Sequence, residues 1–356
     1  MSTPNRGLSA KEAEILASIV VPSESDPKKP EFPPWGPKFP ATPTYKIKVP
    51  GFSNVWLKDE SVNKYGGTHK DRLAWEVVIL YRNFLLAKRR RQQKGSLPTF
   101  SIISSGSAAI AIGRMLKDYG LPRLKVLVDK NLDPKIDDAI KNSHCDVFKT
   151  DLARKPLSPL EILILTHNED GFDLTSNQGT GLEIGNFDWF SYEVLNNSSD
   201  YCFIPFGTGT IFEKILEINK LEVAYAKHDP RFSGDIKILR NCNFMGATSN
   251  NPHTKADKLF AHHLPFPKID EEWIRFYIKS GFCGSQTGIY YLGEKHLDQA
   301  MEITESQGIN CEPSEIAGLA LMLQLKDKLP KDKKMLIINT GKTKLEFDES
   351  EFALTR

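Results

Sequence analysis

The stretch VWLKDESVNKYGGTHKDRLA, residues 55–74, is the part of the chain from which the rest is best understood. Its first four residues, 55–58, predict a short β-strand. After the glycines at 66 and 67, apolar side chains recur at helical spacing from residue 71 to about residue 90, namely Leu73, Val77, Leu80 and Phe84. The sequence therefore predicts a strand, a glycine-containing loop and a helix, with Lys70 at the beginning of that helix.

Lys70 is an unusual residue for the first turn of a helix. A cation at this position opposes the helix dipole, so a stabilising role does not explain it. A lysine whose amine approaches the aldehyde of a carbonyl cofactor from a fixed position can instead form a Schiff base with it. The glycine pair before Lys70 permits close packing against a ring. From these residues alone, a surface charge and a cofactor-binding lysine both remain open.

The composition is that of an ordinary globular protein. The chain has 356 residues, of which 40% are hydrophobic and 26% charged, and this length suits two subdomains or one large α/β domain. Its net charge of +2 gives no general attraction to nucleic acid or to an anionic membrane. The chain contains no apolar run of the roughly 20 residues that span a bilayer and no apolar core of a secretory signal. The five cysteines are scattered along the sequence, which suits reduced thiols, so we expect a cytoplasmic protein. No two of them have the spacing of zinc ligands, so we expect no metal site.

Strand and helix patterns alternate through most of the chain. In the first block we predict strands at 99–103, 125–128 and 145–148 and helices at 108–119 and 134–142. In the second block we predict strands at 201–205, 236–239 and 335–338 and helices at about 211–219 and 314–325. This alternation is typical of parallel sheets with crossover helices. Residues 21–45 are rich in proline and predict an extended arm.

Two turns that connect a strand to a helix are candidate anion sites. Residues 104–109 (Ser-Ser-Gly-Ser-Ala-Ala) can bind a carboxylate through backbone N–H groups, although a serine N-cap would explain one of these serines. Residues 207–210 (Gly-Thr-Gly-Thr) combine unhindered N–H groups with hydroxyls and suit a phosphate, but they lack the full dinucleotide-binding fingerprint.

Residues 341–343 (Gly-Lys-Thr) suggest a nucleotide-binding P-loop at first sight. That pattern needs a glycine where Leu336 stands, so we reject it. Thr340, at the end of a predicted buried strand, can instead hydrogen-bond a ring nitrogen.

In their order along the chain, these segments resemble the fold-type II pyridoxal-phosphate enzymes. This family includes threonine synthase, serine and threonine dehydratases, cysteine synthase and the tryptophan synthase β chain. The resemblance extends from about residue 42 to residue 343 and rests on the segments 42–45 (Thr-Pro-Thr-Tyr), 55–60, 67–72 (Gly-Thr-His-Lys-Asp-Arg), 104–109, 177–184, 207–210, 312–314 (Glu-Pro-Ser) and 340–341 (Thr-Gly).

The resemblance implies a fold and its domains. The fold is α/β, with two subdomains that each contain a mostly parallel twisted sheet flanked by helices, and with the cofactor in the cleft between them. Residues 1–45 would form an N-terminal extension with the proline-rich arm, 46–83 and 171–356 the large cofactor-binding domain, and 84–170 a small mobile substrate domain. A homodimer is also implied.

The resemblance further implies a role for each candidate residue. Lys70 would carry pyridoxal 5′-phosphate, and Thr340 would face its ring nitrogen. The phosphate would be held by Gly207, Thr208, Gly209 and Thr210. The substrate carboxylate would bind at Ser104, Ser105, Gly106, Ser107 and Ala108, and Ser107 would also contact the cofactor.

The implied activity is elimination or replacement at the side chain of a small amino-acid substrate, with Lys70 as Schiff-base lysine and general base. A neutral partner such as Thr340 would not force the ring nitrogen to be protonated, which favours these reactions over transamination. Segments 105–109 (Ser-Gly-Ser-Ala-Ala) and 247–252 look more like threonine synthase than like cysteine synthase, and threonine synthase converts O-phosphohomoserine to threonine and phosphate. Its second phosphate would need extra cations, for which Lys58, Arg114 and Lys255 are candidates. A serine or threonine dehydratase is the first alternative and a cysteine-synthase-like enzyme the second.

Two departures from the family's pattern keep another class of function open. Ser107 stands where the family usually has a longer asparagine, and the loop 207–210 has fewer glycines than usual. A catalytically silent relative that acts as a binding or regulatory protein is therefore the alternative to an enzyme.

Overall fold

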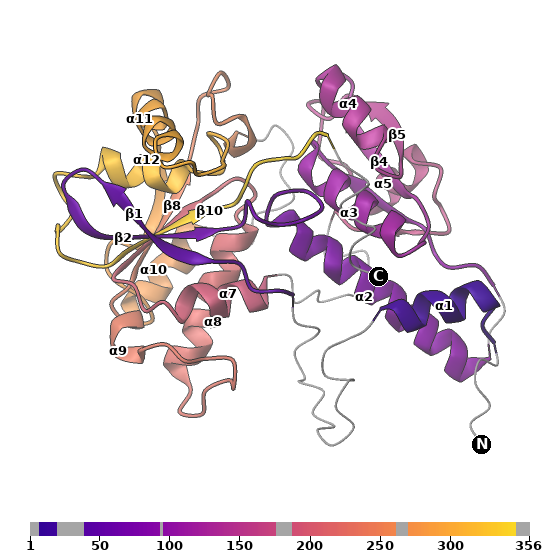
Figure 1. The fold of residues 1–356 in the computed structure, drawn as a ribbon, viewed down its shortest axis with the longest axis horizontal. Coiled ribbons are helices and arrows are strands. Elements are labelled where there is room, and N and C mark those ends of the chain that lie inside the picture. Colours follow the sequence, from indigo (N-terminus) through magenta and orange to yellow (C-terminus); the bar gives the residue numbers. More distant parts are fainter. Residues whose placement is uncertain (1–6, 20–38, 93–94, 176–186, 261–269, 347–356) are drawn as a thin grey trace. The chain divides into compact units, whose positions relative to one another are not determined.

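A computed structural model describes residues 7–19, 39–92, 95–175, 187–260 and 270–346. The chain divides into two compact units, whose elements are labelled in Figure 1. The four-stranded unit comprises Met1–Phe39, Lys64–Asn186 and Thr343–Arg356, and the six-stranded unit comprises Pro40–Asn63 and Phe187–Lys342. Most of the predicted proline-rich arm, and the segment 177–184, lie outside the described residues.

A fully parallel sheet forms the centre of the four-stranded unit. Its strands lie in the order β5 (Cys145–Thr150), β4 (Leu124–Asp129), β3 (Phe100–Ile103) and β6 (Phe172–Asp173). The helices that accompany it are α1 (Ala10–Ser18), α2 (Lys70–Arg91), α3 (Ser107–Asp118), α4 (Pro134–Lys141) and α5 (Pro159–Leu165). One apolar core joins α2 and α3 to the strands. In this core the rings of Tyr81 and Phe100 pack edge to face, with their centres 4.7 Å apart.

The sheet of the six-stranded unit is parallel except at one edge. Its strands lie in the order β1 (Thr44–Val49), β2 (Phe52–Asp59), β10 (Met335–Asn339), β7 (Tyr201–Pro205), β8 (Asn243–Thr248) and β9 (Gly288–Tyr291), and only β1 and β2 pair in antiparallel fashion. Its helices are α7 (Asp188–Leu195), α8 (Thr210–Ala224), α9 (Ile236–Leu239), the short 3₁₀ helix η2 (Asp257–Leu259), α10 (Glu271–Lys279), α11 (Glu294–Glu305) and α12 (Ala317–Gln324). The predicted fold class, α/β with two mostly parallel sheets flanked by helices, is confirmed.

Both faces of the six-stranded sheet are covered, so its central strands are apolar along their whole length. In β10, Met335 and Ile337 belong to the core formed with α11 and α12, whereas Leu336 and Ile338 belong to the core formed with α7, α8 and α10. All four side chains are fully buried. Figure 1 shows these two sets of helices on opposite faces of the sheet. In the described part of the chain, no helix combines the length and the apolar character needed to cross a membrane.

Most predicted strands and helices are confirmed within a few residues, but the strand predicted at 236–239 is wrong. These residues form the helical turn α9, because the carboxylate of Asp235 accepts hydrogen bonds from the N–H groups of Lys237 (2.7 Å) and Ile238 (3.4 Å). An aspartate at this position stabilises a helix start more than the alternating apolar pattern favours a strand. Strand β8, which follows α9 directly, was not predicted, and neither were β1, β6 and β9. Helix α12 also begins later than predicted, because residues 313–316 form turns.

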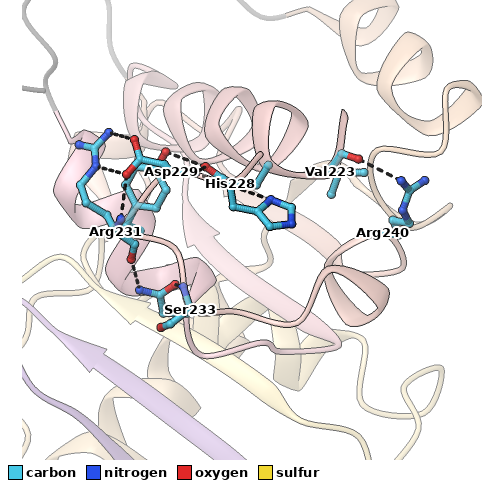
Figure 2. A network of polar contacts seen from close by, with 9 residues as sticks. Val223, His228, Asp229, Arg231, Ser233 and Arg240 are labelled. Atoms are coloured by element: carbon cyan, nitrogen blue, oxygen red, sulfur yellow. Dashed lines mark hydrogen bonds and ion pairs between the residues drawn. The ribbon is translucent and has the colours of Figure 1, made fainter. Parts of the chain in front are cut away.

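A polar network holds the loop between α8 and α9 (Figure 2). Arg231 binds Asp229 through two hydrogen bonds of 2.9 Å, and its guanidinium lies 4.2 Å from the centre of the Tyr192 ring in α7. The Tyr192 hydroxyl donates to Glu222 in α8 (2.9 Å), and His228 Nδ1 lies 3.1 Å from the other oxygen of that carboxylate. The network therefore connects this loop to α7 and α8, and α9 follows the loop.

The two compact units begin and end at other residues than the predicted domains. The prediction placed residues 46–83 in the large domain, whereas the four-stranded unit begins at Lys64 and includes α2. The physical reason is that α2 packs against α3 and shares its apolar core. The last described residues, 343–346, also belong to the four-stranded unit, although the prediction placed them in the large domain.

Helix α3 approaches the beginning of β5 at very short range. A Cβ atom on Gly113 would lie 1.9 Å from the carbonyl oxygen of Ser143 and 2.5 Å from the sulfur of Cys145. Only glycine permits this approach, which helps to set the position of α3 and of the loop 104–108 that begins it.

Gly113→Ala should therefore destabilise the protein, although alanine normally favours a helix interior over glycine by about 1 kcal/mol. We expect the free energy of unfolding to fall by about 1–3 kcal/mol, the usual cost of overpacking, in urea titrations followed by circular dichroism. Gly288→Ala is the control, since its Cβ would meet nothing nearer than 3.4 Å and should change stability by less than about 0.5 kcal/mol. A more stable Gly113→Ala protein would contradict this packing.

Candidate active site

Lys70 begins helix α2, close to the predicted boundary, and its side chain is half-buried. The turn before it is fixed by Thr68, which is fully buried. The backbone N–H of Lys70 donates to Thr68 Oγ1 (3.2 Å), and the N–H of Asp71 donates to the Thr68 carbonyl oxygen (3.1 Å). The backbone therefore fixes the point from which the Lys70 amine projects.

The carboxylate of Asp71 organises the glycine loop that precedes Lys70. It is fully buried and accepts hydrogen bonds from the N–H groups of Tyr65 (2.6 Å) and Gly66 (2.7 Å). A Cβ atom on Gly66 would lie 2.7 Å from this carboxylate and 2.9 Å from the Cβ of Ala111. Glycine is thus required for the loop to close over Asp71 and α3.

Arg114 holds the same loop from the other side. It is buried in α3 and donates to the carbonyl oxygens of Tyr65 (2.8 Å), Lys344 (2.8 Å) and Leu345 (2.9 Å). Burial lowers the pKa of Arg114 to about 10, against the charge of Asp71, which raises it. Arg114 therefore joins the segment after β10 to the loop before Lys70.

The loop 104–108 is shaped by its own first serine. Ser104 is buried, and its Oγ accepts hydrogen bonds from the N–H groups of Gly106 (3.1 Å) and Ala109 (3.2 Å). Gly106 has φ 142°, a conformation that favours glycine, and it precedes Ser107, the first residue of α3. Ser105 is exposed, whereas Ser107 and Ala108 are half-buried. Because the first N–H groups of a helix have no partner within the helix, Ser107 and Ala108 are placed to bind an anion.

The six-stranded sheet brings the other candidate residues to one edge. Strand β10 is parallel to both of its neighbours, β2 and β7, so the three strands end at the same edge. Glu60 follows β2, Thr340 follows β10, and the turn that contains Gly207 follows β7. Ligands of parallel sheets usually bind outside this edge. The sequence prediction that Thr340 and residues 207–210 serve one site is therefore consistent with the topology.

The loop 207–210 has the features of a phosphate site. A Cβ atom on Gly207 would lie 2.7 Å from the carbonyl oxygen of Lys258, so the loop can pass here only as glycine. Gly209 has φ 80° and stands at the N-cap of α8, a helix of 15 residues. The hydroxyl oxygens of Thr208 and Thr210 lie 3.1 Å apart. Backbone N–H groups at this helix start and two hydroxyls suit a phosphate.

Sequence reasoning missed the residues that surround Thr340. Its hydroxyl donates a hydrogen bond to Glu315, and Glu315 forms an ion pair with Lys258 at 3.0 Å. In the sequence, Glu315 is only part of a predicted helix start, and Lys258 has no motif around it. The Glu-Pro-Ser segment at 312–314 was the signal, since Glu312 also pairs with Lys258.

The three cations considered for a second phosphate are already engaged by this chain. Lys58 is 1% exposed and binds Glu193 (2.5 Å) and the carbonyl oxygen of Thr42 (2.6 Å). Arg114 binds the carbonyl oxygens described above. Lys255 is exposed and binds Asp298 (2.5 Å).

The architecture defines a class of protein: two α/β units with parallel sheets, a lysine at a helix start in one unit and a glycine-containing turn at the sheet edge of the other. The family model of pyridoxal-phosphate dependent enzymes matches residues 38–341, and the chain belongs to that family. The cofactor predicted from the sequence, pyridoxal 5′-phosphate, is thereby confirmed.

Comparison with solved structures agrees with this assignment. O-ureido-L-serine synthase is 17% identical, with a TM-score of 0.59 over 88% of this chain and 91% of its own. The diaminopropionate ammonia lyase of Escherichia coli is 12% identical, with a TM-score of 0.58 over 99% and 93%, and a threonine deaminase from T.th. is 14% identical, with a TM-score of 0.54 over 83% and 90%. At this identity the likeness establishes the fold alone. No curated protein sequence matches the chain significantly.

The residues present fit the chemistry of this cofactor. An aldehyde requires an amine, which Lys70 offers from a fixed turn in the four-stranded unit. A phosphate requires N–H donors and room for close approach, which Gly207 and Gly209 provide in the six-stranded unit. Thr340 provides a buried hydroxyl at the end of β10 in that same unit.

Asp71→Asn should weaken the loop that positions Lys70. An asparagine has one acceptor oxygen, so its amide would face one of the two N–H donors of residues 65 and 66. We expect the free energy of unfolding to fall by about 1–3 kcal/mol, the cost of an unsatisfied buried group. Asp118→Asn is the control, because its acceptor role toward the Tyr65 hydroxyl (2.7 Å) can be kept by the amide oxygen. Equal losses in the two variants, measured by urea unfolding, would contradict the role given to Asp71.

Proposed function

We propose that this protein is a pyridoxal-phosphate-dependent lyase that eliminates a side-chain group from an amino acid, with Lys70 as its catalytic residue. The observation that carries the proposal is the placement of Lys70, which occupies the first position of α2 after a loop held by Asp71, Thr68 and Arg114. A lysine held this way gains no helix stability and can meet a reacting carbon at a defined distance.

Each group has a role in the proposed reaction. The N–H groups at the start of α3, including those of Ser107 and Ala108, bind and orient the substrate carboxylate. Residues 207–210 hold the cofactor phosphate, and Thr340 contacts the ring nitrogen. The amine of Lys70 removes the proton from the substrate α carbon as general base. When bound, the cofactor supplies an electron sink for the charge that this step creates.

The charges of the described residues favour a substrate without a phosphate. A phosphorylated substrate needs cations in addition to the loop 207–210, and Lys58, Arg114 and Lys255 are occupied by internal partners. Two proteins of similar fold, a threonine deaminase and a diaminopropionate ammonia lyase, are named for the release of ammonia from amino acids. We therefore place ammonia release from a hydroxy or amino side-chain substrate first.

Threonine-synthase-like activity is the second candidate. The segments 105–109 and 247–252 favour it, since their sequences resemble that branch more than cysteine synthase. The homodimer and the cytoplasmic location expected from the sequence belong to this proposal as predictions. A catalytically silent protein, suggested by Ser107, is the outcome that the following experiment separates from both.

The test is a substrate panel on the purified, cofactor-loaded protein. Threonine, serine and 2,3-diaminopropionate are assayed for release of a keto acid and ammonia, and O-phosphohomoserine for release of phosphate. We expect keto acid from at least one of the first three. Lys70→Ala should lower this rate by roughly 10²–10⁴-fold or more, the usual contribution of a positioned general base. Lys46→Ala, an exposed lysine of β1, should keep the wild-type rate.

Each other outcome has a distinct meaning. Phosphate release without keto acid would replace the first candidate by the second. A protein that binds the cofactor but turns over no substrate would support the silent relative. Equal rates in Lys70→Ala and wild type would overturn the proposed role of Lys70.

A further inference from the structure

The hydroxyl of Thr340 has a fixed hydrogen-bond partner within the six-stranded unit. Thr340 is 2% exposed and Glu315 is 6% exposed. The Thr340 hydroxyl donates to one carboxylate oxygen of Glu315, and the Thr340 backbone N–H donates to the Glu315 carbonyl oxygen (3.1 Å). The end of β10 and the turn before α12 are therefore joined twice at this residue pair.

Lys258 holds the Glu315 side chain in place. Its ammonium lies 3.0 Å from the second oxygen of Glu315 and also pairs with Glu312. Burial alone would lower the pKa of Lys258, but the charges of the two glutamates outweigh it, so that its pKa lies above the usual value. Both oxygens of Glu315 are thus engaged, one by the ammonium and one by the Thr340 hydroxyl.

This arrangement decides which kind of hydrogen bond Thr340 can offer to a ligand. A carboxylate only accepts hydrogen bonds, so the hydroxyl proton of Thr340 must point toward Glu315. The Thr340 oxygen then presents lone pairs and no proton to any group that lies against it. A neutral pyridine nitrogen, itself an acceptor, would find no donor here, whereas a protonated ring nitrogen would find its acceptor.

We propose that Glu315 is a positioning residue that turns Thr340 into an obligatory acceptor, so that this protein holds its cofactor with a protonated ring nitrogen. This inference rests on the proposed contact between Thr340 and the ring nitrogen. It goes beyond the sequence expectation, in which a neutral Thr340 does not force the ring nitrogen to be protonated. The charges agree with it, because the ammonium of Lys258 is paired with two glutamates, Glu312 and Glu315.

The protonated ring has a chemical consequence. A pyridinium withdraws electrons more strongly than a neutral pyridine, so the bound cofactor would stabilise charge at the substrate α carbon more strongly. Glu315 would act through Thr340 and would not itself contact the reacting atoms.

The test measures the ring nitrogen directly. The protein without cofactor is loaded with pyridoxal phosphate that carries ¹⁵N in the ring, and the ¹⁵N chemical shift of the resting complex is recorded. We expect the shift of a pyridinium in the wild type. In Glu315→Gln the side-chain amide can donate to Thr340, which frees the hydroxyl proton for the ring, so the shift should move to that of a neutral pyridine.

Glu312→Gln is the matched control. This substitution removes one of the two carboxylates that pair with Lys258 and leaves the hydrogen bond between Thr340 and Glu315 in place. We expect this variant to keep the pyridinium shift. Should Glu315→Gln fail to fold, Thr340→Val removes the acceptor and should also give the neutral shift.

A neutral shift in the wild type would overturn the proposal, as would identical shifts in the two glutamine variants. A protein that takes up no labelled cofactor would overturn the proposed function with it. Bound cofactor with a neutral ring would overturn this inference alone.

Discussion

The structure of the six-stranded unit depends on the insertion of β10 between β2 and β7. This strand comes from the last part of the chain, yet it pairs in parallel with strands formed by residues 52–59 and 201–205. Its side chains are buried on both faces, and such burial of apolar surface is the main favourable term in folding. Because three parallel strands end together, the residues after them meet at one edge, and both Thr340 and Gly207 owe their positions to it. Pairings between strands so distant in sequence form slowly in general, because they cost loop-closure entropy.

A second constraint acts in the four-stranded unit, where buried polar groups fix the loop before Lys70. Asp71 accepts two backbone N–H groups and Arg114 donates to three carbonyl oxygens, so the loop is held without a strand or helix of its own. Hydrogen bonds to charged groups contribute about 1.5–3 kcal/mol each, and an unsatisfied buried partner costs about as much. The loop before Lys70 is thus fixed by buried charged groups within its own unit.

The sequence predicted the elements that local pattern controls. Lys70 at a helix start, the glycine turn at 207–210 and the fold class followed from spacing and from the family resemblance. The failures have physical causes that a pattern does not contain. At 236–239 the cap supplied by Asp235 overrides an apolar alternation. Glu315, which accepts the hydrogen bond from Thr340, lies 25 positions earlier in the chain, and Lys258, which pairs with Glu315, lies earlier still. Only the fold brings these three residues together. The hydrogen bond from Thr340 to Glu315 is charge-assisted, and such bonds are about twice as strong as bonds between neutral groups.

In the proposed function, Lys70 is the lysine that carries the cofactor. Reduction of the holoprotein with borohydride fixes a lysine-bound pyridoxyl group permanently, and peptide mass spectrometry then locates it. We expect the added mass on the peptide that contains Lys70 and not on peptides that contain other lysines, including the half-buried Lys258. A pyridoxyl group on Lys258, or on any lysine other than Lys70, would contradict the role proposed for Lys70.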